Sequence, residues 1–365
     1  MRRDTGFTLM ELLLTMVILG FVLAGITQTF TGILTQFKQQ SKIAETSIEG
    51  IVGLELLRQD LENAGFGLYW RSGAITYQEA SAATAYNDSP SDPPRAYGVG
   101  SGAGWNGSDE LIIKATNAAM NGTAQKWSYI DSANTPKVWI PPQSAAGSSE
   151  DLKSSDRVIV TLAGTSDSNR RTLVTASTGT SVWRTTFGAT ADFVPSSGYN
   201  FVYGVDHDTD LRMPFNRADY YIVDPANATS RPQRCAPNAS VLQKTVISQA
   251  DGVRRNPMPL LDCVAGMQIV FRLDRDGDGT IESNTDVLTD NVSGAALTAE
   301  QIRNQVKEVR VYILAHEGQK DTSYTHQANI LVGEAGIGGS TFNVGPNVNY
   351  RWKLYILVVK PKNLK

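Results

Sequence analysis

Histidine and cysteine are scarce in this chain, which has three histidines and two cysteines among 365 residues. Two cysteines cannot form the disulfide framework that holds a small secreted scaffold together. The histidines show no spacing typical of metal ligands. Charge of one sign is also lacking, because 33 Lys and Arg nearly cancel 36 Asp and Glu. This balance argues against a nucleic-acid-binding protein with a basic surface.

Catalytic signatures are lacking as well. The chain contains no G-x-S-x-G, no H-E-x-x-H, no G-K-[ST] and no C-x-x-C motif. One match to G-x-G-x-x-A, from Gly98 to Ala103, follows a proline-rich stretch rather than a strand, so it does not indicate a dinucleotide-binding loop. The sequence therefore predicts a protein that is not an enzyme.

Composition favours a secreted, β-rich protein. Charged residues make up 19% of the chain, below the roughly 25% of typical globular proteins. Gly, Ser, Thr, Asn and Ala fill the difference, as in loop-rich β proteins. Hydrophobic residues reach 41%, which is enough for a substantial core and excludes wholesale disorder.

The longest hydrophobic run begins at Phe7 and ends at Ile26, behind the basic pair Arg2 and Arg3. Twenty helical residues span roughly 30 Å, the thickness of the hydrocarbon core of a bilayer. The arginines would stay in the cytoplasm and the rest of the chain would lie outside. A secretory signal peptide is the alternative, but this run exceeds the usual h-region, and its nearest cleavage candidate, Leu23 to Gly25, lies inside it.

Glu11 interrupts this hydrophobic run. A carboxylate near the middle of a membrane span costs about 2.5–3.5 kcal/mol, so it usually has a partner. Cleavage between Gly6 and Phe7 would create an α-amine four residues from Glu11, on the same face of a helix. The amine and the carboxylate could then neutralise each other, within one chain or between adjacent chains.

The segment from Gly6 to Leu13, GFTLMELL, resembles the processing signal of type IV prepilins. The resemblance implies cleavage between Gly6 and Phe7 by prepilin peptidase, N-methylation of Phe7 and retention of the apolar helix. The phrase LRQDLENAGF, residues 57–66, resembles the same place in PilW-type minor pilins, although a generic amphipathic helix would also explain it. Major pilins often carry a proline at the position matching Gln28, and its absence favours a minor subunit.

The resemblance also implies a role and partners. PilW-type minor pilins help to initiate filament assembly and are thought to occupy the filament tip, sometimes with a large adhesin. The implied partners are other minor pilins, the major pilin, prepilin peptidase and the inner membrane, with no nucleic acid. The head would lie in the periplasm and then on the pilus or cell surface.

Two alternatives to this role remain. A J-type minor pseudopilin of a type II secretion system shares the helix and a β-rich head. A surface-binding or adhesin module could also be carried on a pilin helix, which would require an exposed aromatic patch. The candidate residues for such a patch are Trp105, Trp127, Trp139 and Trp183.

We predict an α+β fold with a cleaved leader at 1–6, a pilin helix at 7–65 and a β-rich head at 66–365. The transmembrane half of the helix is 7–26. A 3.6-residue hydrophobic period continues to Leu61, and Gly65 and Gly67 follow as a stop signal. A short second helix is predicted at 299–305 with Thr298 as its N-cap.

The head is expected to be mostly antiparallel β, in two sheets packed on the helix, and residues 66–107 are expected to form an irregular surface excursion. The predicted strands are 110–115, 137–140, 157–162, 171–176, 181–187, 201–205, 220–223, 267–273, 306–315 and 353–359.

A calcium loop is the strongest local motif in the head. Asp274, Asp276 and Asp278 occupy positions 1, 3 and 5 of such a loop, and Thr280 and Glu282 could add oxygen ligands. The bidentate acid of position 12 is missing, and no helices flank the loop, so we predict weak Ca²⁺ binding between two strands. The alternative is a solvated acidic hairpin turn. We interpret the second acidic run, residues 206–210, as a solvated loop.

The two cysteines, Cys235 and Cys263, fall on the predicted outer side of the membrane, where the environment is oxidising. We predict that they form a disulfide, which would stabilise the head by roughly 3–4 kcal/mol. Two buried free thiols are the alternative.

Overall fold

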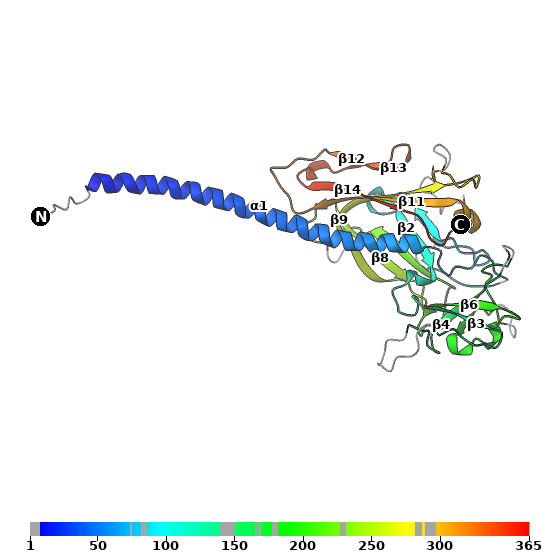
Figure 1. Cartoon of the computed structure of the whole chain (residues 1–365). Coiled ribbons are helices and arrows are strands. Elements are labelled where there is room, and N and C mark those ends of the chain that lie inside the picture. The colour runs from blue at the N-terminus through cyan, green and yellow to red at the C-terminus, as the bar shows by residue number, and fades with distance from the viewer. Residues whose placement is uncertain are drawn as a thin grey trace.

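The computed structural model describes residues 8–73, 75–81, 86–138, 150–164, 166, 169–176, 182–226, 231–281, 287–288 and 297–364. A long helix, α1, extends from a head built of antiparallel sheets, and only the C-terminal part of α1 lies against that head (Figure 1). The α+β, pilin-like architecture predicted from the sequence is therefore confirmed.

Helix α1 comprises Leu9–Asn63, a length of 55 residues. Its N-terminus is closed by a capping box between Thr8 and Glu11. After Ala64 the chain leaves the helix through Gly65, whose φ of +81° suits glycine. By length and composition α1 is the one helix among the described residues that could cross a membrane, a test that soluble core helices and signal sequences also pass.

The largest sheet has eight strands in the order β1-β2-β7-β8-β9-β11-β14, with β10 paired to β9, and all its pairings are antiparallel. Its strands are β1 (Tyr97–Gly100), β2 (Glu110–Ala115), β7 (Asn216–Ile222), β8 (Ser240–Ile247), β9 (Arg254–Leu273), β10 (Val287–Leu288), β11 (Val306–Glu317) and β14 (Arg351–Val359).

Two smaller sheets complete the head. A four-stranded sheet has the order β3-β6-β4-β5, and a two-stranded hairpin of β12 and β13 packs near β9. The strands are β3 (Trp127–Asp131), β4 (Arg157–Leu162), β5 (Arg184–Thr186), β6 (Tyr199–Asp206), β12 (Asn329–Glu334) and β13 (Ile337–Asn343). The second helix, α2, is Ala299–Gln305 with a capping box at Thr298, as predicted. Short 3₁₀ turns lie at Trp105–Gly107, Thr116–Ala118, Phe187–Ala189, Ala191–Phe193 and Gly345–Asn347.

The main core lies between α1 and the eight-stranded sheet. Leu54, Leu57 and Leu61 of α1 are buried together with alternate residues of the sheet strands. Leu57 and Leu61 are fully buried, which is why the helix periodicity continues into the head.

Several sequence predictions about the head are wrong. Residues 66–107 are not a surface excursion, because Tyr69, Tyr77 and Tyr97 are buried and the stretch contains β1. The head has three sheets among its described residues rather than two. The stretch 171–176 forms only isolated bridges, and Lys137 and Val138 are outside any strand, while the rest of 137–140 lies outside the described residues.

Candidate functional site

The processing residues Gly6 and Phe7 lie outside the described residues. Glu11 is described, and its carboxylate accepts hydrogen bonds from the backbone N–H and the hydroxyl of Thr8, at 3.0 and 2.8 Å. The Glu11 side chain is therefore directed toward the start of the helix, next to the residue at which the predicted mature chain would begin. Its role in assembly stays a prediction.

The N-terminal half of α1 presents a continuous exposed hydrophobic surface. Phe21, Phe30 and Phe37 are 76%, 58% and 68% exposed, and the hydrophobic residues between them are exposed too. An exposed apolar surface of this size on a soluble domain would be exceptional. It is suited to lipid or to the apolar helices of other subunits.

Two glycines let α1 approach the centre of the sheet closely. A Cβ atom at Gly53 would lie 1.7 Å from the carbonyl oxygen of Leu260 in β9, and one at Gly50 would lie 2.9 Å from a methyl carbon of Leu261. The two glycines are three residues apart, on one face of the helix. Glycine at 53 is therefore required for the observed packing of helix on strand.

A polar contact fixes α1 to the sheet about two turns further along. The Asp60 carboxylate accepts hydrogen bonds from the Tyr220 hydroxyl at 2.6 Å and from the Lys244 ammonium at 2.7 Å. The Lys244 side chain is only 5% exposed, so Asp60 neutralises a nearly buried charge. The sequence analysis missed this contact, since Lys244 lies in a strand that it did not predict.

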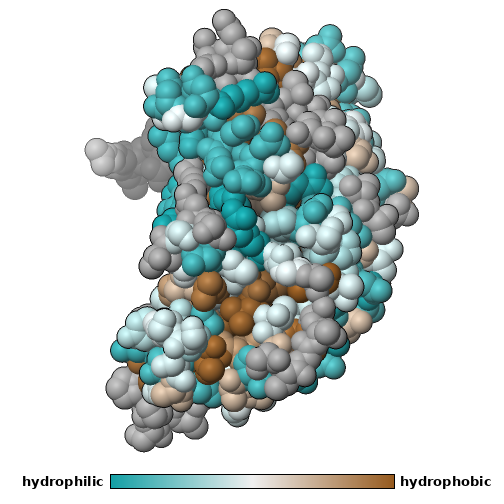
Figure 2. Space-filling view, turned by 90° about the vertical axis from the view of Figure 1, so that its right-hand side faces the viewer, coloured by the Kyte–Doolittle hydropathy of each residue, from teal (hydrophilic) through white to brown (hydrophobic). Residues whose placement is uncertain are grey.

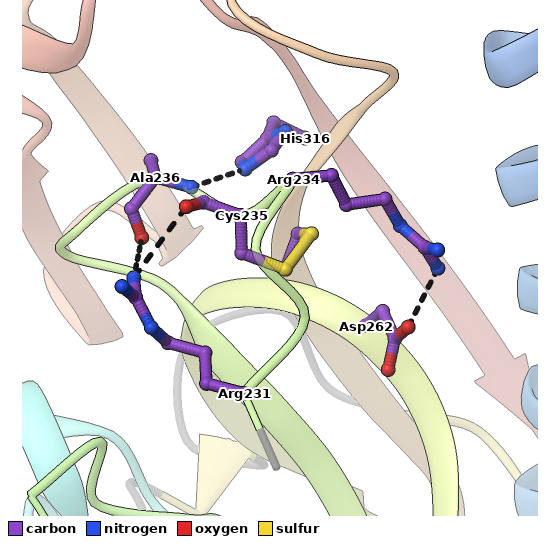
Figure 3. Close-up of a disulfide and its surroundings, with 7 residues drawn as sticks. Arg231, Arg234, Cys235, Ala236, Asp262 and His316 are labelled. Carbon is purple, nitrogen blue, oxygen red and sulfur yellow. Dashed lines mark hydrogen bonds and ion pairs between the residues drawn. A yellow bond between two sulfur atoms is a disulfide. The ribbon is translucent and has the colours of Figure 1, made fainter.

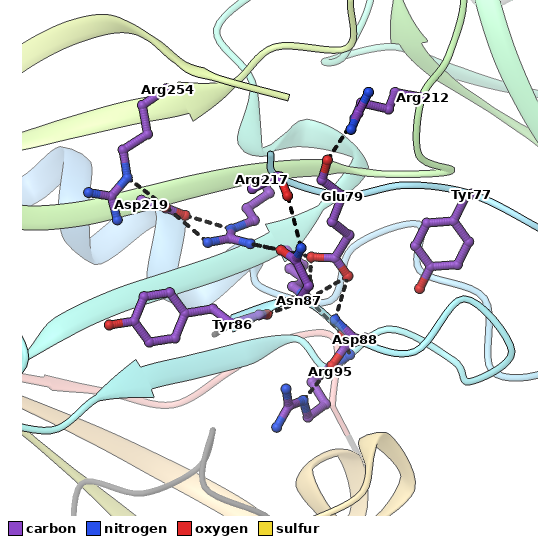
Figure 4. Close-up of polar contacts among 12 residues, drawn as sticks. Tyr77, Glu79, Tyr86, Asn87, Asp88, Arg95, Arg212, Arg217, Asp219 and Arg254 are labelled. Carbon is purple, nitrogen blue, oxygen red and sulfur yellow. Dashed lines mark hydrogen bonds and ion pairs between the residues drawn. The ribbon is translucent and has the colours of Figure 1, made fainter. Parts of the chain in front are cut away.

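The head also contains a buried network of charged residues that the sequence analysis missed (Figure 4). The Lys114 ammonium on β2 lies 2.8 Å from Glu79 and 2.6 Å from Asp88, and it also donates to the backbone carbonyl of Tyr86. Burial alone would raise the pKa of the Asp88 carboxyl, but Lys114 and Arg95 outweigh burial and hold that pKa below its usual value. These contacts fix the segment around residues 79–95 onto the sheet.

Strand β7 extends the same network. The Arg217 guanidinium, which is fully buried, donates to the Asp219 carboxylate at 2.7 Å and lies 3.4 Å from Glu79. Arg254 of β9 joins Asp219 at 2.9 Å. Buried charges are tolerated only when they are paired in this way. The signal available in the sequence was Lys114 itself, a lysine within the hydrophobic run of a predicted strand.

The acidic loop at Asp274 forms the connection between β9 and β10. Asp274 is buried, and its oxygens accept hydrogen bonds from the N–H groups of Gly277 and Gly279. Asp276 accepts from the N–H of Asp278. The carboxylate oxygens of Asp274, Asp276 and Asp278 lie within 4.8 Å of one another. Oxygens this close together can reach a single ion at a Ca²⁺–oxygen distance of about 2.4 Å. Asp206, His207 and Asp208 of the other acidic loop lie equally close to one another.

Of the two further predicted ligands, Thr280 and Glu282, the structure describes only Thr280. Thr280 is exposed, and its N–H and hydroxyl both donate to Asp278, which lowers the pKa of that carboxyl. Glu282 lies outside the described residues. One cation competes for the site, because the Lys307 ammonium is 3.8 Å from Asp274.

The predicted disulfide between Cys235 and Cys263 is present (Figure 3). It joins the loop before β8 to Cys263 of β9, a residue with a φ of +58° where the strand changes its pairing partner from β8 to β11. His316 lies beside it, and its Nε2 accepts a hydrogen bond from the backbone N–H of Ala236. Burial lowers the pKa of His316 to about 4, so the imidazole is neutral at pH 7. The disulfide therefore belongs to a packed structural cluster.

The four tryptophans proposed for an aromatic patch differ in placement. Trp183 is buried and its indole N–H donates to the carbonyl of Thr76. Trp105 packs against the main core, and Trp139 lies outside the described residues. Trp127 is half-buried on one face of the four-stranded sheet, beside other aromatic residues.

The prokaryotic N-terminal methylation motif family matches residues 1–27. Comparison with curated proteins and comparison with solved structures each returned no match. The motif and the α+β architecture together support a type IV pilin-like protein, either a pilin or a pseudopilin. The motif also fits an anchored protein whose apolar helix stays in the membrane, and the family that carries this motif is structural rather than enzymatic.

Proposed function

We propose that the chain is a structural minor pilin of a type IV pilus, which helps to initiate filament assembly and sits at the filament tip. One observation carries this proposal: a methylation motif begins a helix whose hydrophobic N-terminal half is exposed and whose C-terminal half is built into the head. The exposed half would pack against the helices of other minor pilins and of the major pilin. The continuous helix through Gln28, where major pilins often have proline, supports a minor subunit.

The J-type pseudopilin of a type II secretion system is the competing assignment, since the same helix and head would serve it. Affinity purification of the tagged full chain from its native membrane separates the two. Recovery of pilus subunits supports our proposal, whereas recovery of secretion-system subunits alone would assign the chain to the pseudopilins.

We predict that the mature protein begins at an N-methylated Phe7. Processing by prepilin peptidase would leave Arg2 and Arg3 in the cytoplasm and retain the apolar helix. Intact-mass measurement and N-terminal sequencing of the protein extracted from membranes check this. A mature chain beginning after Gly25, or one still carrying Met1, would contradict the pilin assignment.

We predict that Glu11→Ala inserts into the membrane at least as well as the wild type but associates less with other pilins. Removal of the carboxylate lowers the cost of insertion by about 2.5–3.5 kcal/mol, while an ion pair with a Phe7 amine in hydrocarbon is lost. Membrane fractionation and co-purification with co-expressed minor pilins measure the two effects. Glu55→Ala is the matched control, because Glu55 is an exposed glutamate of the same helix. Equal recovery of partners with both variants would rule out a docking role for Glu11.

We also propose that the loop from Asp274 to Thr280 binds Ca²⁺ weakly and stabilises the head. The three clustered carboxylates support this, and Glu282 is proposed as a further ligand. A ligand that binds only the folded state at 100 times its dissociation constant adds about 2.7 kcal/mol to the free energy of unfolding. We therefore expect the detergent-solubilised full chain to melt at a higher temperature in millimolar Ca²⁺ than in chelator.

The calcium prediction has a matched pair of variants. Asp276→Ala with Asp278→Ala should abolish the Ca²⁺-dependent shift, because two of the three clustered carboxylates are removed. Asp208→Ala with Asp210→Ala removes the same number of carboxylates from the other acidic loop and should retain the shift. A wild-type protein that melts equally with Ca²⁺ and with chelator would show that the loop is only an acidic turn.

A further inference from the structure

The four-stranded sheet has one face that is packed and one that is rich in aromatic residues. On the packed face Ile130, Val158 and Val202 belong to a separate hydrophobic cluster. Because side chains alternate along a strand, the neighbouring residues of β3 and β6 lie on the opposite face. We call this opposite surface the aromatic face; it is formed by Trp127, Tyr129, Tyr199 and Phe201.

The rings of the aromatic face are held in fixed orientations by one another. Tyr129 and Tyr199 meet edge to face with ring centroids 4.8 Å apart, and Trp127 and Phe201 do so at 6.1 Å. Edge-to-face pairs of this kind are favoured geometries for aromatic rings. Tyr199 is 55% exposed, and the other three residues are half-buried. Trp127 and Phe201 also pack against the main core, so the face offers preorganised ring surface to solvent at Tyr199 and Tyr129.

The inner end of this face is anchored in the main core. Tyr203, the next residue on the same side of β6, is buried and packs edge to face on Phe66 just beyond α1, with centroids 5.5 Å apart. Along β6 the aromatic face therefore begins at the buried Tyr203 and becomes more exposed toward Tyr199. In Figure 2 hydrophobic residues gather in the lower half of the face it views, at about the level at which Figure 1 shows β3, β4 and β6. Tyrosine and tryptophan are not hydrophobic on the scale of that figure, so its brown colour does not mark the tyrosines or the tryptophan of the aromatic face.

A pocket adjoins the aromatic face at Trp127. It has a volume of about 450 Å³ and is lined by Gly122, Gln125, Lys126, Trp127 and Glu150. Lys126 and Glu150 carry opposite charges, so the pocket has little net charge. Its volume falls within the 300–1,000 Å³ range of small-molecule sites. The Gln125 amide donates to the backbone carbonyls of Asn117 and Ala119, and the Lys126 ammonium donates to that of Asp151. Ring surface thus lies next to the amide oxygen of Gln125 and the carboxylate of Glu150, which can accept hydrogen bonds from hydroxyl groups.

The chemistry of this surface favours a neutral saccharide. The C–H faces of a pyranose ring pack on aromatic rings, while its hydroxyls need both hydrogen-bond donors and acceptors. Single-stranded nucleic acid also stacks on aromatic residues, but it requires a positively charged groove, and β3 and β6 carry no Lys or Arg.

The aromatic residues of β3 and β6 by themselves cover too small an area for a standard protein interface. β3 has five residues, so it is roughly 17 Å long, and neighbouring strands are about 4.8 Å apart. Two strands with their side chains therefore cover on the order of 250 Å², well below the roughly 800 Å² per partner of a stable protein complex. A glycan of a few sugar units fits an area of this size.

We infer that the aromatic face and the adjoining pocket bind a neutral oligosaccharide. Stacking on Tyr199 and Tyr129 would supply most of the affinity, and the Gln125 amide oxygen and the Glu150 carboxylate would accept hydrogen bonds from hydroxyl groups of the terminal sugar. This inference does not depend on the assembly role proposed above, since the helix would simply carry the binding site out of the cell.

The test uses the full-length chain in a detergent without a sugar headgroup and follows its tryptophan fluorescence during titration. The probes are cellohexaose, maltohexaose and chitohexaose as neutral hexamers, with hexagalacturonate as the acidic comparison. We expect saturable binding of at least one neutral hexamer and weaker binding of the acidic one. Tyr129→Ala combined with Tyr199→Ala should weaken that binding at least tenfold, as expected for the loss of stacked rings.

Two further variants distinguish stacking from a structural effect. Tyr199→Phe keeps the ring and should retain binding. Tyr324→Ala removes a half-buried tyrosine elsewhere, whose ring lies under Arg351, and should lower the melting temperature while leaving binding unchanged. Because Tyr199 is mostly exposed, Tyr199→Ala should fold and reports on binding by itself. The inference is overturned if no neutral hexamer binds the wild type at millimolar concentration, or if binding survives in the double alanine variant.

Discussion

Gly53→Ala should lower the free energy of unfolding of the head by about 3 kcal/mol or more, the upper end of the overpacking range. The added Cβ would lie 1.7 Å from the Leu260 carbonyl oxygen, and a backbone atom of a central strand cannot move aside as a flexible side chain can. Relief requires α1 to separate from β9, which would expose part of the main core. The melting temperature of the full chain should fall by roughly 6 °C or more.

Two other glycines of the same helix provide graded controls for this result. Gly50→Ala meets the end of the Leu261 side chain, so its effect should be smaller. Gly32→Ala meets nothing within 4 Å and should leave the head unchanged while favouring the helix itself. If Gly53→Ala melts like Gly32→Ala, the close packing of α1 on β9 is wrong.

Lys114→Met should lower the free energy of unfolding by about 3 kcal/mol at pH 7, the lower end of the cost of removing one partner of a buried ion pair, because Glu79 keeps Arg217 and Asp88 keeps Arg95 as partners. Glu79 and Asp88 both contact the ammonium, and the side chains of Lys114 and Glu79 are each 1% exposed. Methionine fills a similar volume, so the loss reports on charge rather than on a cavity. Urea unfolding of the full chain measures it.

The dependence of this difference on pH provides an independent check. The pKa of Asp88 is lowered in the folded wild type, so the stabilisation from its ionised form is complete above about pH 4 and is lost as the pH falls further. The difference between wild type and Lys114→Met should therefore shrink in acid. Lys320→Met, at an exposed lysine, should stay within about 0.5 kcal/mol of wild type. A Lys114→Met variant as stable as this control would refute the pairing.

Local signals in the sequence were sufficient to predict where both helices begin and end, to within two residues. Thr298 as N-cap predicted the short helix α2 with its observed bounds, because capping depends on residues only three positions apart. The same holds for α1, whose stop was predicted from Gly65 and Gly67. Strands with hydrophobic residues on both faces, such as β2 and β4, were also predicted with their observed bounds.

Long-range pairing explains what the sequence analysis missed. β8 carries Gln243 and Lys244, which weaken its strand pattern, and Lys244 becomes a core residue only because Asp60 of α1 reaches it. We predicted that residues 66–107 form a surface excursion, because they are rich in turn-forming residues. Lys114 and Arg217 nevertheless hold Glu79, within this stretch, on the sheet. No local pattern encodes a contact between charges that lie more than 30 residues apart.

The aromatic face illustrates the same limit. Trp127 was a candidate for a surface patch from its residue type alone. Its grouping with Phe201 depends on the register of β3 against β6, in which Tyr129 pairs with Phe201. A shift by one residue would place these rings on the packed face instead.

The position of the disulfide has a mechanical consequence for a subunit under tension. A load applied through α1 enters the head at β9, where Leu260 and Leu261 meet the helix. The disulfide ends at Cys263, two residues further along that strand, and ties it to a residue 28 positions earlier in the chain. If β8 were pulled away from β9, the loop between the two cysteines could not lengthen, although the same stretch without the bond would extend by roughly 90 Å. Under force the head can therefore extend only by unfolding residues outside the segment between Cys235 and Cys263. The disulfide thus limits how far the chain around β9, which contacts α1, can be pulled out.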